Sequence, residues 1–546
     1  MPGSLPAHAS GQSHSPRNAA KLLRRARAAH DGGDAAKADR LYAELLEMEP
    51  ANFDALHGRG RLHHDCRRYD SALSLIQAAL RIDARRPDGF SSLGLAFYEL
   101  RRLDHALTSF EAGLRIAPAD AQLLNQRGVV LLELGGTSEA LASFEQALVA
   151  DSASLDALGN YGNALLKLNR PADAIAVYDR ALALAPHNAG LLTNRAIALR
   201  KLDRPQEALM SVRRALAAKP DFAQARFVDS LVRLTLGDFD AGWRAYESRW
   251  QGRNLSSQRR AFAPPLWLGE GTLTGKTILL HAEQGFGDTM QFVRYAPLIT
   301  ARGARVVLEV QRELVRLVSR LEGIDTVIGR GEALPAFDLH CPLLSLPFAC
   351  RTELASIPAP VPYLAAADED VALWRARLPQ GAAHIVRPRI GVVWSGDPSH
   401  DNDVNRSLRL TALAPLFAVP DIDFVSLQYR VRDADKTVLA VIPNLFCFEQ
   451  TFRDFADTAA VVANLDAVVS IDSAVAHLTG AMGKPLFLLL PLGADFRWLR
   501  ERTDSPWYPS ARLFRQPRFG DWDSVIESVA QDLRARFAPQ AHKLTA

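Results

Sequence analysis

The chain reads LDALGNYGNALLKLNRPADAIAVYDRALALAPHN over residues 155–188, and units of the same length and pattern recur through its N-terminal part. An alanine recurs every 34 residues. A glycine lies twelve residues before four of these alanines, and a large aromatic or aliphatic residue lies four residues after each of them. A fixed period of this length indicates a solenoid of stacked units. The alanines that mark the 34-residue period are Ala38, Ala72, Ala106, Ala140, Ala174 and Ala208.

Each unit predicts two amphipathic helices with one break between them and one after them. The small residue lets two helix backbones approach closely, the large side chain fills space between hairpins, and a proline stops the second helix. These features resemble tetratricopeptide (TPR) repeats over roughly Ala19 to Asp221, with a degenerate seventh unit from Phe222 to Trp250. An unrelated helical bundle would need no fixed period. The resemblance implies a superhelix whose concave face binds a peptide or protein segment.

Composition excludes several classes of protein. A length of 546 residues suits about three or four domains. The 64 Lys and Arg residues against 61 Asp and Glu residues give a net charge of +3, too balanced to predict nucleic-acid binding. The apolar runs are too short for a membrane span, the N-terminus lacks the apolar region of a signal peptide, and the four cysteines show no CxxC spacing. We therefore expect a cytoplasmic chain that begins with a disordered lead-in at residues 1–18.

From Pro264 the pattern changes to short apolar runs separated by helical stretches, beginning with KTILLHAEQ at residues 276–284. A second series begins with RIGVVWSG at residues 389–396, after a connection rich in proline and alanine. Alternating strands and helices are typical of parallel sheets. The predicted fold class is therefore α + α/β: a solenoid over residues 19–252, then Rossmann-like α/β halves over residues 264–365 and 385–546. Ligands of such sheets bind beyond the carboxyl ends of the strands.

The first candidate loop is EQGFGD at Glu283–Asp288, which follows a strand and opens a helix. Gly285 and Gly287 permit close approach of the backbone to a ligand. Met290 occupies the slot of the third glycine in a dinucleotide fingerprint, so that fingerprint is incomplete. A carboxylate at a helix start stays ionised, as a general base requires. Asp288 equally fits a plain helix cap.

Two loops of the second series are candidate anion sites. Asp472, Ser473 and Ala474 open a helix, whose free amides and dipole favour a phosphate. His477 lies one turn further and can face the same anion, although a lone histidine in an apolar helix also suits a hydrogen-bonded core position.

The other anion loop follows the strand that ends at Ser395 and Gly396, and it contains Arg406, whose planar guanidinium can pair with a diphosphate. A solvated surface loop is the alternative. Asp401 and Asp403 form a DND triplet resembling the metal-binding triplet of some sugar transferases. Because further ligands are not evident, we expect no metal there.

Taken together, EQGFGD, WSG with a later RS, SLQ at residues 426–428 and DSAVAHLTGAMGKP resemble the heptosyltransferase-like glycosyltransferases of family nine. The likeness covers roughly Pro264 to Ala538 and implies a GT-B fold that works without a metal or other cofactor. The implied reaction is transfer of a sugar, with inversion, from a nucleotide diphosphate sugar to an acceptor.

The resemblance also implies roles for single residues. Asp288 would accept the proton of the acceptor hydroxyl, beside Gly285 and Gly287 of the acceptor-side loop. Gln428 would contact the nucleotide or its ribose. The pyrophosphate would lie against residues of the two anion loops, with Asp472 shaping the turn: Ser473, Ala474 and His477 on one side, and Ser395, Gly396 and Arg406 on the other.

Some positions depart from the family. Arg406 stands where a lysine is common, Ala474 stands where a glycine is frequent, and the family lacks repeats, so a heptose donor and a lipopolysaccharide acceptor are not implied. The domain order is similar to that of protein O-linked GlcNAc transferases, in architecture alone. The leading hypothesis is an inverting glycosyltransferase whose solenoid selects a protein or peptide acceptor. The alternatives are a catalytically idle TPR scaffold and another enzyme with a phosphate ligand at the same helix start.

Overall fold

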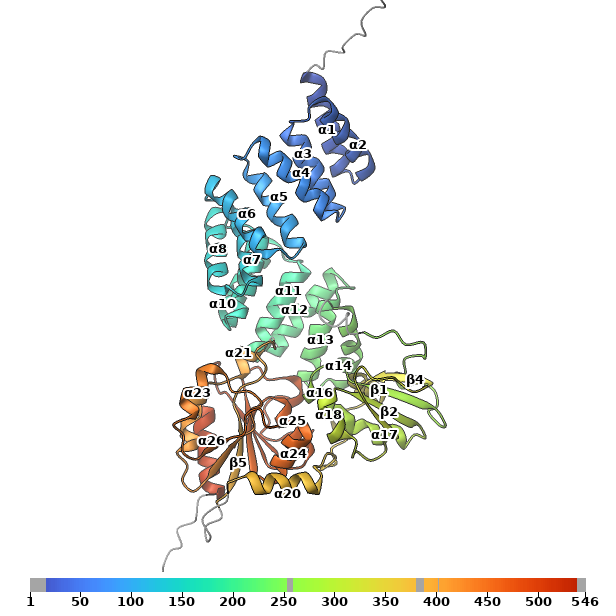
Figure 1. Ribbon diagram of the computed structural model, residues 1–546, viewed down its shortest axis with the longest axis vertical. Coiled ribbons are helices and arrows are strands. Elements are labelled where there is room, and N and C mark those ends of the chain that lie inside the picture. Colours follow the sequence, from blue (N-terminus) through green and yellow to red (C-terminus); the bar gives the residue numbers. More distant parts are fainter. Residues whose placement is uncertain (1–15, 253–258, 380–386, 401, 538–546) are drawn as a thin grey trace, which may run out of the picture. The chain divides into compact units, whose positions relative to one another are not determined.

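The computed structural model describes residues 16–252, 259–379, 387–400 and 402–537 (Figure 1). Residues 1–15 of the predicted lead-in, the predicted boundary at residue 385, and Asp401 lie outside the described residues. The chain divides into two compact units, which meet in sequence between Pro186 and His187. Within the described ranges, no helix combines the length and the apolar character that crossing a membrane requires.

The described residues of the first unit fold into antiparallel helix hairpins, and each hairpin packs on the next one in sequence. The first helix begins at Pro16, so the last three residues of the predicted lead-in are helical. The helices are α1 (Pro16–Asp31), α2 (Ala35–Met48), α3 (Phe53–Asp65), α4 (Tyr69–Ile82), α5 (Pro87–Glu99), α6 (Leu103–Ile116), α7 (Ala121–Glu133), α8 (Thr137–Ala150), α9 (Leu155–Lys167) and α10 (Pro171–Leu184).

The repeat slots confirm the predicted hairpins and specify their packing. A Cβ atom added at Gly94, Gly128 or Gly162 would lie 2.3–2.5 Å from the ring of the large residue sixteen positions later. The aromatic ring therefore lies directly on the glycine of its own hairpin, in addition to filling space between hairpins. The predicted break between paired helices falls on a residue with positive φ every 34 residues, at Gly33, Arg67, Arg101, Gly135, Asn169, Asp203 and Gly237.

The second unit begins with the last repeat helices, α11 (Ala189–Lys201), α12 (Pro205–Ala218), α13 (Ala223–Thr235) and α14 (Phe239–Tyr246), followed by η1 (Glu247–Gln251). Its first sheet has the order β3-β2-β1-β4, and every pairing is parallel. Its strands are β1 (Thr277–His281), β2 (Arg305–Val310), β3 (Thr326–Gly329) and β4 (Leu339–Pro342), with helices α16 (Phe286–Phe292), α17 (Ala296–Thr300), α18 (Arg312–Val318) and α19 (Leu346–Ala349).

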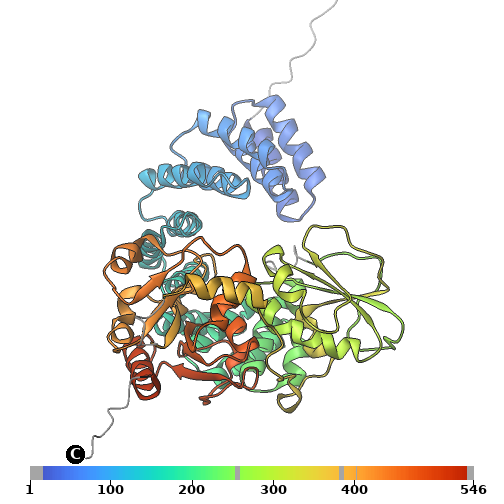
Figure 2. The ribbon, with the colours of Figure 1, turned by 60° about the horizontal axis from the view of Figure 1, so that its bottom comes forward.

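The second sheet has the order β10-β9-β8-β5-β6-β7, again parallel throughout. Both halves, green to yellow and orange to red in Figure 2, therefore confirm the predicted α/β architecture. The strands are β5 (Arg389–Val393), β6 (Asp423–Ser426), β7 (Leu445–Cys447), β8 (Ala467–Ile471), β9 (Leu486–Leu490) and β10 (Ala511–Arg515). The helices are α20 (Asp368–Arg377), α21 (Asp403–Arg406), α22 (Ala414–Phe417), α23 (Asp433–Leu439), α24 (Phe455–Ala463), α25 (Ala474–Ala481) and α26 (Trp522–Phe537).

This strand order is that of doubly wound sheets, in which the chain reverses its direction of growth at a switch point. The switch point lies between β1 and β4 in the first sheet and between β5 and β8 in the second. The loop of Gly285 and Gly287 follows β1, and the two candidate anion loops follow β5 and β8. The predicted loops thus lie at the ends of the strands where such folds bind ligands.

The last repeat hairpins share a core with the α/β halves. The Trp243 ring of α14 packs edge-on against Phe292 and Phe496, with ring centroids 6.1 and 5.5 Å away. The buried Arg249 guanidinium donates to Glu283 at 3.0 Å and to Ser345 at 2.8 Å. The division between compact units therefore falls inside the predicted solenoid of residues 19–252, ahead of its last two hairpins.

Candidate functional site

Helix α16 of the first α/β half meets the start of helix α25 of the second half. A Cβ atom added at Gly287 would lie 2.7 Å from Cδ2 of His477 and 3.5 Å from Cα of Ala474. This close approach requires a glycine. The two sequence motifs GFGD and DSAVAH are consequently neighbours in space.

Asp288 lies in the first turn of α16 with both carboxylate oxygens engaged. Oδ2 accepts a hydrogen bond from the Gly285 amide at 2.9 Å, which makes Asp288 part of the helix cap. Oδ1 accepts from Nη2 of Arg497 at 2.5 Å. Arg497 is buried and also donates to Gln291 at 2.6 Å and to Asp495 at 2.8 Å. The guanidinium therefore fixes the direction of the Asp288 carboxylate.

The two anion loops converge at the switch point of the second sheet. Nη1 of the half-buried Arg406 donates to the Asp472 carbonyl at 2.9 Å, and its buried Nε has no partner among the described residues. A Cβ atom added at Gly396 would lie 2.9 Å from Nη2 of Arg406. The Ser473 side chain caps α25 by accepting a hydrogen bond from the Ala476 amide. The first amides of the helix, beginning at Ala474, have no intrahelical partners, as at every helix start. This arrangement can receive an anion.

His477 is held in one orientation as a neutral side chain. Its Nδ1 pairs with the Tyr508 hydroxyl at 2.9 Å, and its ring stacks on Trp498 with centroids 5.4 Å apart. Burial and the nearby Arg497 lower the pKa of His477 to about 3. Its Nε2 lies 3.9 Å from Asp472, whose pKa is raised to about 6 by burial and by Asp495. His477 thus has the contacts of a core residue while facing the candidate site.

Gln428 follows β6 and forms hydrogen bonds with residues that follow β5. Its Oε1 accepts from the backbone amides of Trp394 and Ser395 at 3.1 and 3.2 Å, and its Nε2 donates to the Ser395 hydroxyl at 2.8 Å. The side chain is buried. Through these bonds Gln428 supports the Ser395 loop, and it does not present a free amide to a nucleotide.

Asp403 of the DND triplet forms hydrogen bonds that hold the same loop in place. Its carboxylate accepts from Nη2 of Arg432 and from the Ser407 hydroxyl, each at 2.6 Å. Arg432 also donates to the Gly396 carbonyl at 2.9 Å. In the part of the chain that the structure describes, no group of three or more His, Cys, Asp or Glu side chains is arranged to hold a metal ion.

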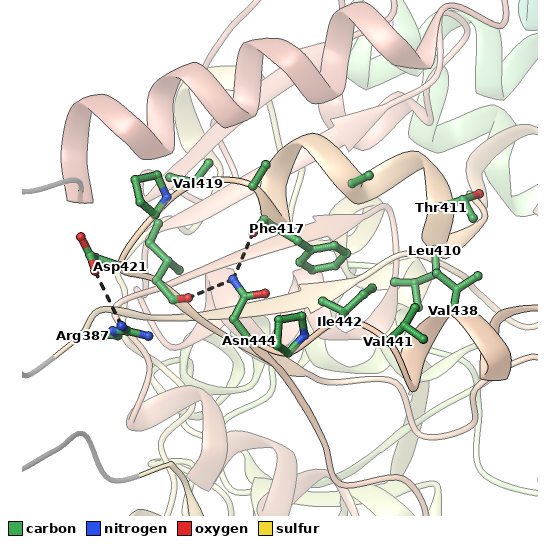
Figure 3. A pocket seen from close by; sticks show the side chains of 15 residues that line it. Arg387, Leu410, Thr411, Phe417, Val419, Asp421, Val438, Val441, Ile442 and Asn444 are labelled. Carbon is green, nitrogen blue, oxygen red and sulfur yellow. Dashed lines mark hydrogen bonds and ion pairs between the residues drawn. The ribbon is translucent and has the colours of Figure 1, made fainter.

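A separate pocket of about 570 Å³ lies at the amino end of β6 (Figure 3). Asn444 donates to the backbone carbonyls of Phe417 and Ile422, and Arg387 lies 3.7 Å from Asp421. The rest of the lining is mostly apolar. The pocket is at the opposite end of the sheet from the loops after β5 and β8, so it is not part of the candidate site.

In the first unit, polar side chains of successive repeats are linked across the first helices of the hairpins. His57 pairs with Ser92 at 2.9 Å, Ser91 donates to Gln126 at 2.8 Å, and Asn160 donates to Asn125 at 3.0 Å. A pocket of about 340 Å³ lies beside the last pair, between α5, α7 and α9. These side chains form a polar face along the first helices of the hairpins.

The contact between the two halves makes a prediction for Gly287→Ala. The added methyl group would press on the His477 ring, which Tyr508 and Trp498 hold in place, so we expect a loss of about 1–3 kcal/mol in the free energy of unfolding. Urea denaturation measures the loss. Gly285→Ala is the matched control, because its Cβ would meet only Oδ2 of Asp288, at 3.3 Å. Equal stability of the two variants would contradict the close contact.

The comparison with protein families agrees with the repeats. The tetratricopeptide repeat family matches residues 23–88, 67–121, 92–150, 125–189 and 193–257. Protein FlbA of Caulobacter vibrioides is 27% identical over 337 residues, which cover 58% of this chain and 55% of FlbA. The chain therefore spans about half the length of this curated relative.

Solved structures of tetratricopeptide repeat proteins match part of this chain. A thermophilic TPR protein of Thermus thermophilus is 26% identical, with a TM-score of 0.30, and the match covers 33% of this chain and 98% of that one. A tetratricopeptide repeat protein of Parabacteroides merdae is 16% identical, with a TM-score of 0.38, and the match covers 44% of this chain and 96% of that one. The N-terminal part of this chain is a solenoid of tetratricopeptide repeats.

Proposed function

We propose that the two α/β halves form a GT-B glycosyltransferase, which moves a sugar with inversion from a nucleotide diphosphate sugar to a protein or peptide selected by the TPR solenoid. The contact between α16 and the start of α25 is the observation that carries this proposal. It puts the carboxylate of Asp288 and the open amides at Ala474 on neighbouring helix starts, one from each half. A sugar bound beside this contact would have a base on one side and its leaving group on the other.

The chemistry of each side fits the proposed reaction. Asp288 would take the proton from the acceptor hydroxyl as that oxygen attacks the sugar. Arg406 and the first amides of α25 would stabilise the negative charge that grows on the departing diphosphate. Arg497 would keep the carboxylate aligned, and Gln428 would act through the Ser395 loop that it supports.

A second candidate function is a TPR scaffold whose α/β halves are catalytically idle. The bonds of Asp288 favour it, since Arg497 and the Gly285 amide occupy both carboxylate oxygens, as in a structural cap. The polar face of the first unit serves either function, because TPR repeats generally bind protein segments. The two functions differ in whether a nucleotide sugar binds.

Donor binding tests the proposal. We expect one or more of a panel of UDP, GDP and ADP sugars to raise the melting temperature of the full chain, since a ligand of the native state stabilises it. Arg406→Ala should weaken that binding about 10- to 100-fold, because charge-assisted hydrogen bonds contribute about 1.5–3 kcal/mol. Binding of the bare nucleoside should not change, because it has no phosphate.

The matched control for the donor experiment is Arg409→Ala. Arg409 is exposed and lies three residues after Arg406, so this variant removes the same charge without touching the proposed phosphate site. We expect this variant to bind the donor as the wild type does. Absence of stabilisation by every nucleotide sugar would favour the scaffold, and equal losses for donor and nucleoside would remove Arg406 from the phosphate site.

A further inference from the structure

We propose that the last repeat hairpins position the Asp288 carboxylate, and that they do so through the segment Gly493–Trp498, with Gly493 and Phe496 as positioning residues. The inference rests on the proposed function for the role of Asp288, and on the structure of the second unit for the route. It makes the end of the solenoid a working part of the transferase site as well as a means of selecting the acceptor.

The segment that carries Asp495 and Arg497 lies directly on the end of α11. A Cβ atom added at Gly493 would lie 2.2 Å from the Arg200 carbonyl oxygen and 2.6 Å from the Lys201 carbonyl oxygen. Because backbone meets backbone, neither side can yield as a flexible side chain would. A shift of the α11 terminus would therefore move this segment.

The next hairpin holds the same segment from α14. The ring of Phe496, in η6 (Phe496–Trp498), lies 5.5 Å from Trp243 and 6.2 Å from Tyr246, measured between centroids. All three side chains are buried. The side chains of α14 thus fix the position of Phe496, and Arg497 is the next residue in the chain.

The charges complete the route from α11 to Asp288. Burial raises the pKa of Asp495, but the charge and hydrogen bonds of Arg497, with a further contribution from Arg200, bring it below its ordinary value. Asp495 accepts from the backbone amide and from Nη1 of Arg497, while Nη2 of the same guanidinium bonds Asp288. The position of the segment Gly493–Trp498 therefore sets the position of the Arg497 guanidinium, and the guanidinium sets that of the Asp288 carboxylate.

Hydrogen exchange of the full chain, followed by mass spectrometry, tests this route without needing activity. We expect Gly493→Ala to speed exchange of the amides in Gly285–Phe292 by about threefold or more, because the added methyl group would push the segment off the α11 carbonyls and loosen the anchor through Arg497. Phe496→Leu, which loses the ring contacts with Trp243 and Tyr246 and keeps an apolar side chain, should speed exchange in the same segment. The control is Asp203→Asn, which breaks the 2.8 Å ion pair of Asp203 with Arg500 at the same junction. Asparagine tolerates the positive φ of this position, and we expect no change in Gly285–Phe292.

The outcomes separate positioning from general loosening. Wild-type exchange in Gly493→Ala or Phe496→Leu, or equal acceleration in Asp203→Asn, would overturn the inference. The proposed function fails on a different result, the absence of nucleotide-sugar binding by the wild type. Where transfer is measurable, Phe496→Leu should lower kcat about three- to tenfold with the donor Kd unchanged, since misplaced catalytic groups act on the chemical step.

Discussion

The Asp288→Asn variant is expected to lose sugar transfer by about 100- to 10,000-fold, the usual contribution of a general base. Asparagine has the shape of aspartate, and its oxygen can still accept from Arg497 or from the Gly285 amide. It cannot accept the proton of the acceptor hydroxyl. The donor should bind unchanged, because the proposed phosphate contacts lie on Arg406 and the start of α25.

Two measurements on the same protein check this result: donor affinity by calorimetry, and transfer or donor hydrolysis by detection of the released nucleotide. The matched control is Asp433→Asn, which changes another aspartate in the first turn of a helix, 95% exposed and paired only with Lys436 among the described contacts. Its activity should equal that of the wild type. Full activity of Asp288→Asn would assign the base to another residue. Donor binding without sugar transfer in both the wild type and Asp288→Asn would favour the scaffold.

The repeats could be predicted almost completely from the sequence, because each unit solves the same local packing problem. Gly162 and Tyr178 recur together since the ring of one needs the missing side chain of the other. The break between paired helices likewise recurs, with a left-handed backbone at Asn169 and at the same position of the other repeats. A short-range pattern of this kind is visible in one chain without any knowledge of distant contacts.

The loops of the α/β halves could be predicted from the ends of their strands, but the charges between them could not. Arg200, Asp288 and Arg497 come from three distant segments, and only tertiary packing brings their neighbourhoods together. Arg497 stands between two aromatic residues and fits no helix or strand period that would mark it. The family resemblance implies a nucleotide contact for Gln428, yet its position at a strand end equally allows the backbone bonds that it makes.

Removal of residues 1–252, the whole predicted solenoid with its lead-in, is expected to prevent the α/β halves from folding, whereas removal of residues 1–186 should leave a folded protein. Repeats of a solenoid contact mainly their neighbours, so the shorter deletion takes away whole units. The longer one also removes Trp243 and Arg249 from the core of the second unit. Circular dichroism and gel filtration of the purified chains distinguish a cooperative melt from an aggregated product.

The loss of Arg249 accounts for much of the expected difference. Its side chain is 0% exposed and that of its partner Glu283 is 2% exposed, so the deletion leaves a buried carboxyl group without its cation. Breaking a buried pair in this way costs about 3–5 kcal/mol, against a total stability of about 5–15 kcal/mol for a typical protein. Burial already raises the pKa of Glu283 to about 7 with Arg249 in place. Glu283→Gln in the chain that lacks residues 1–252 should therefore recover part of the folding, and a fully folded truncated chain without that substitution would show that the last hairpins are dispensable.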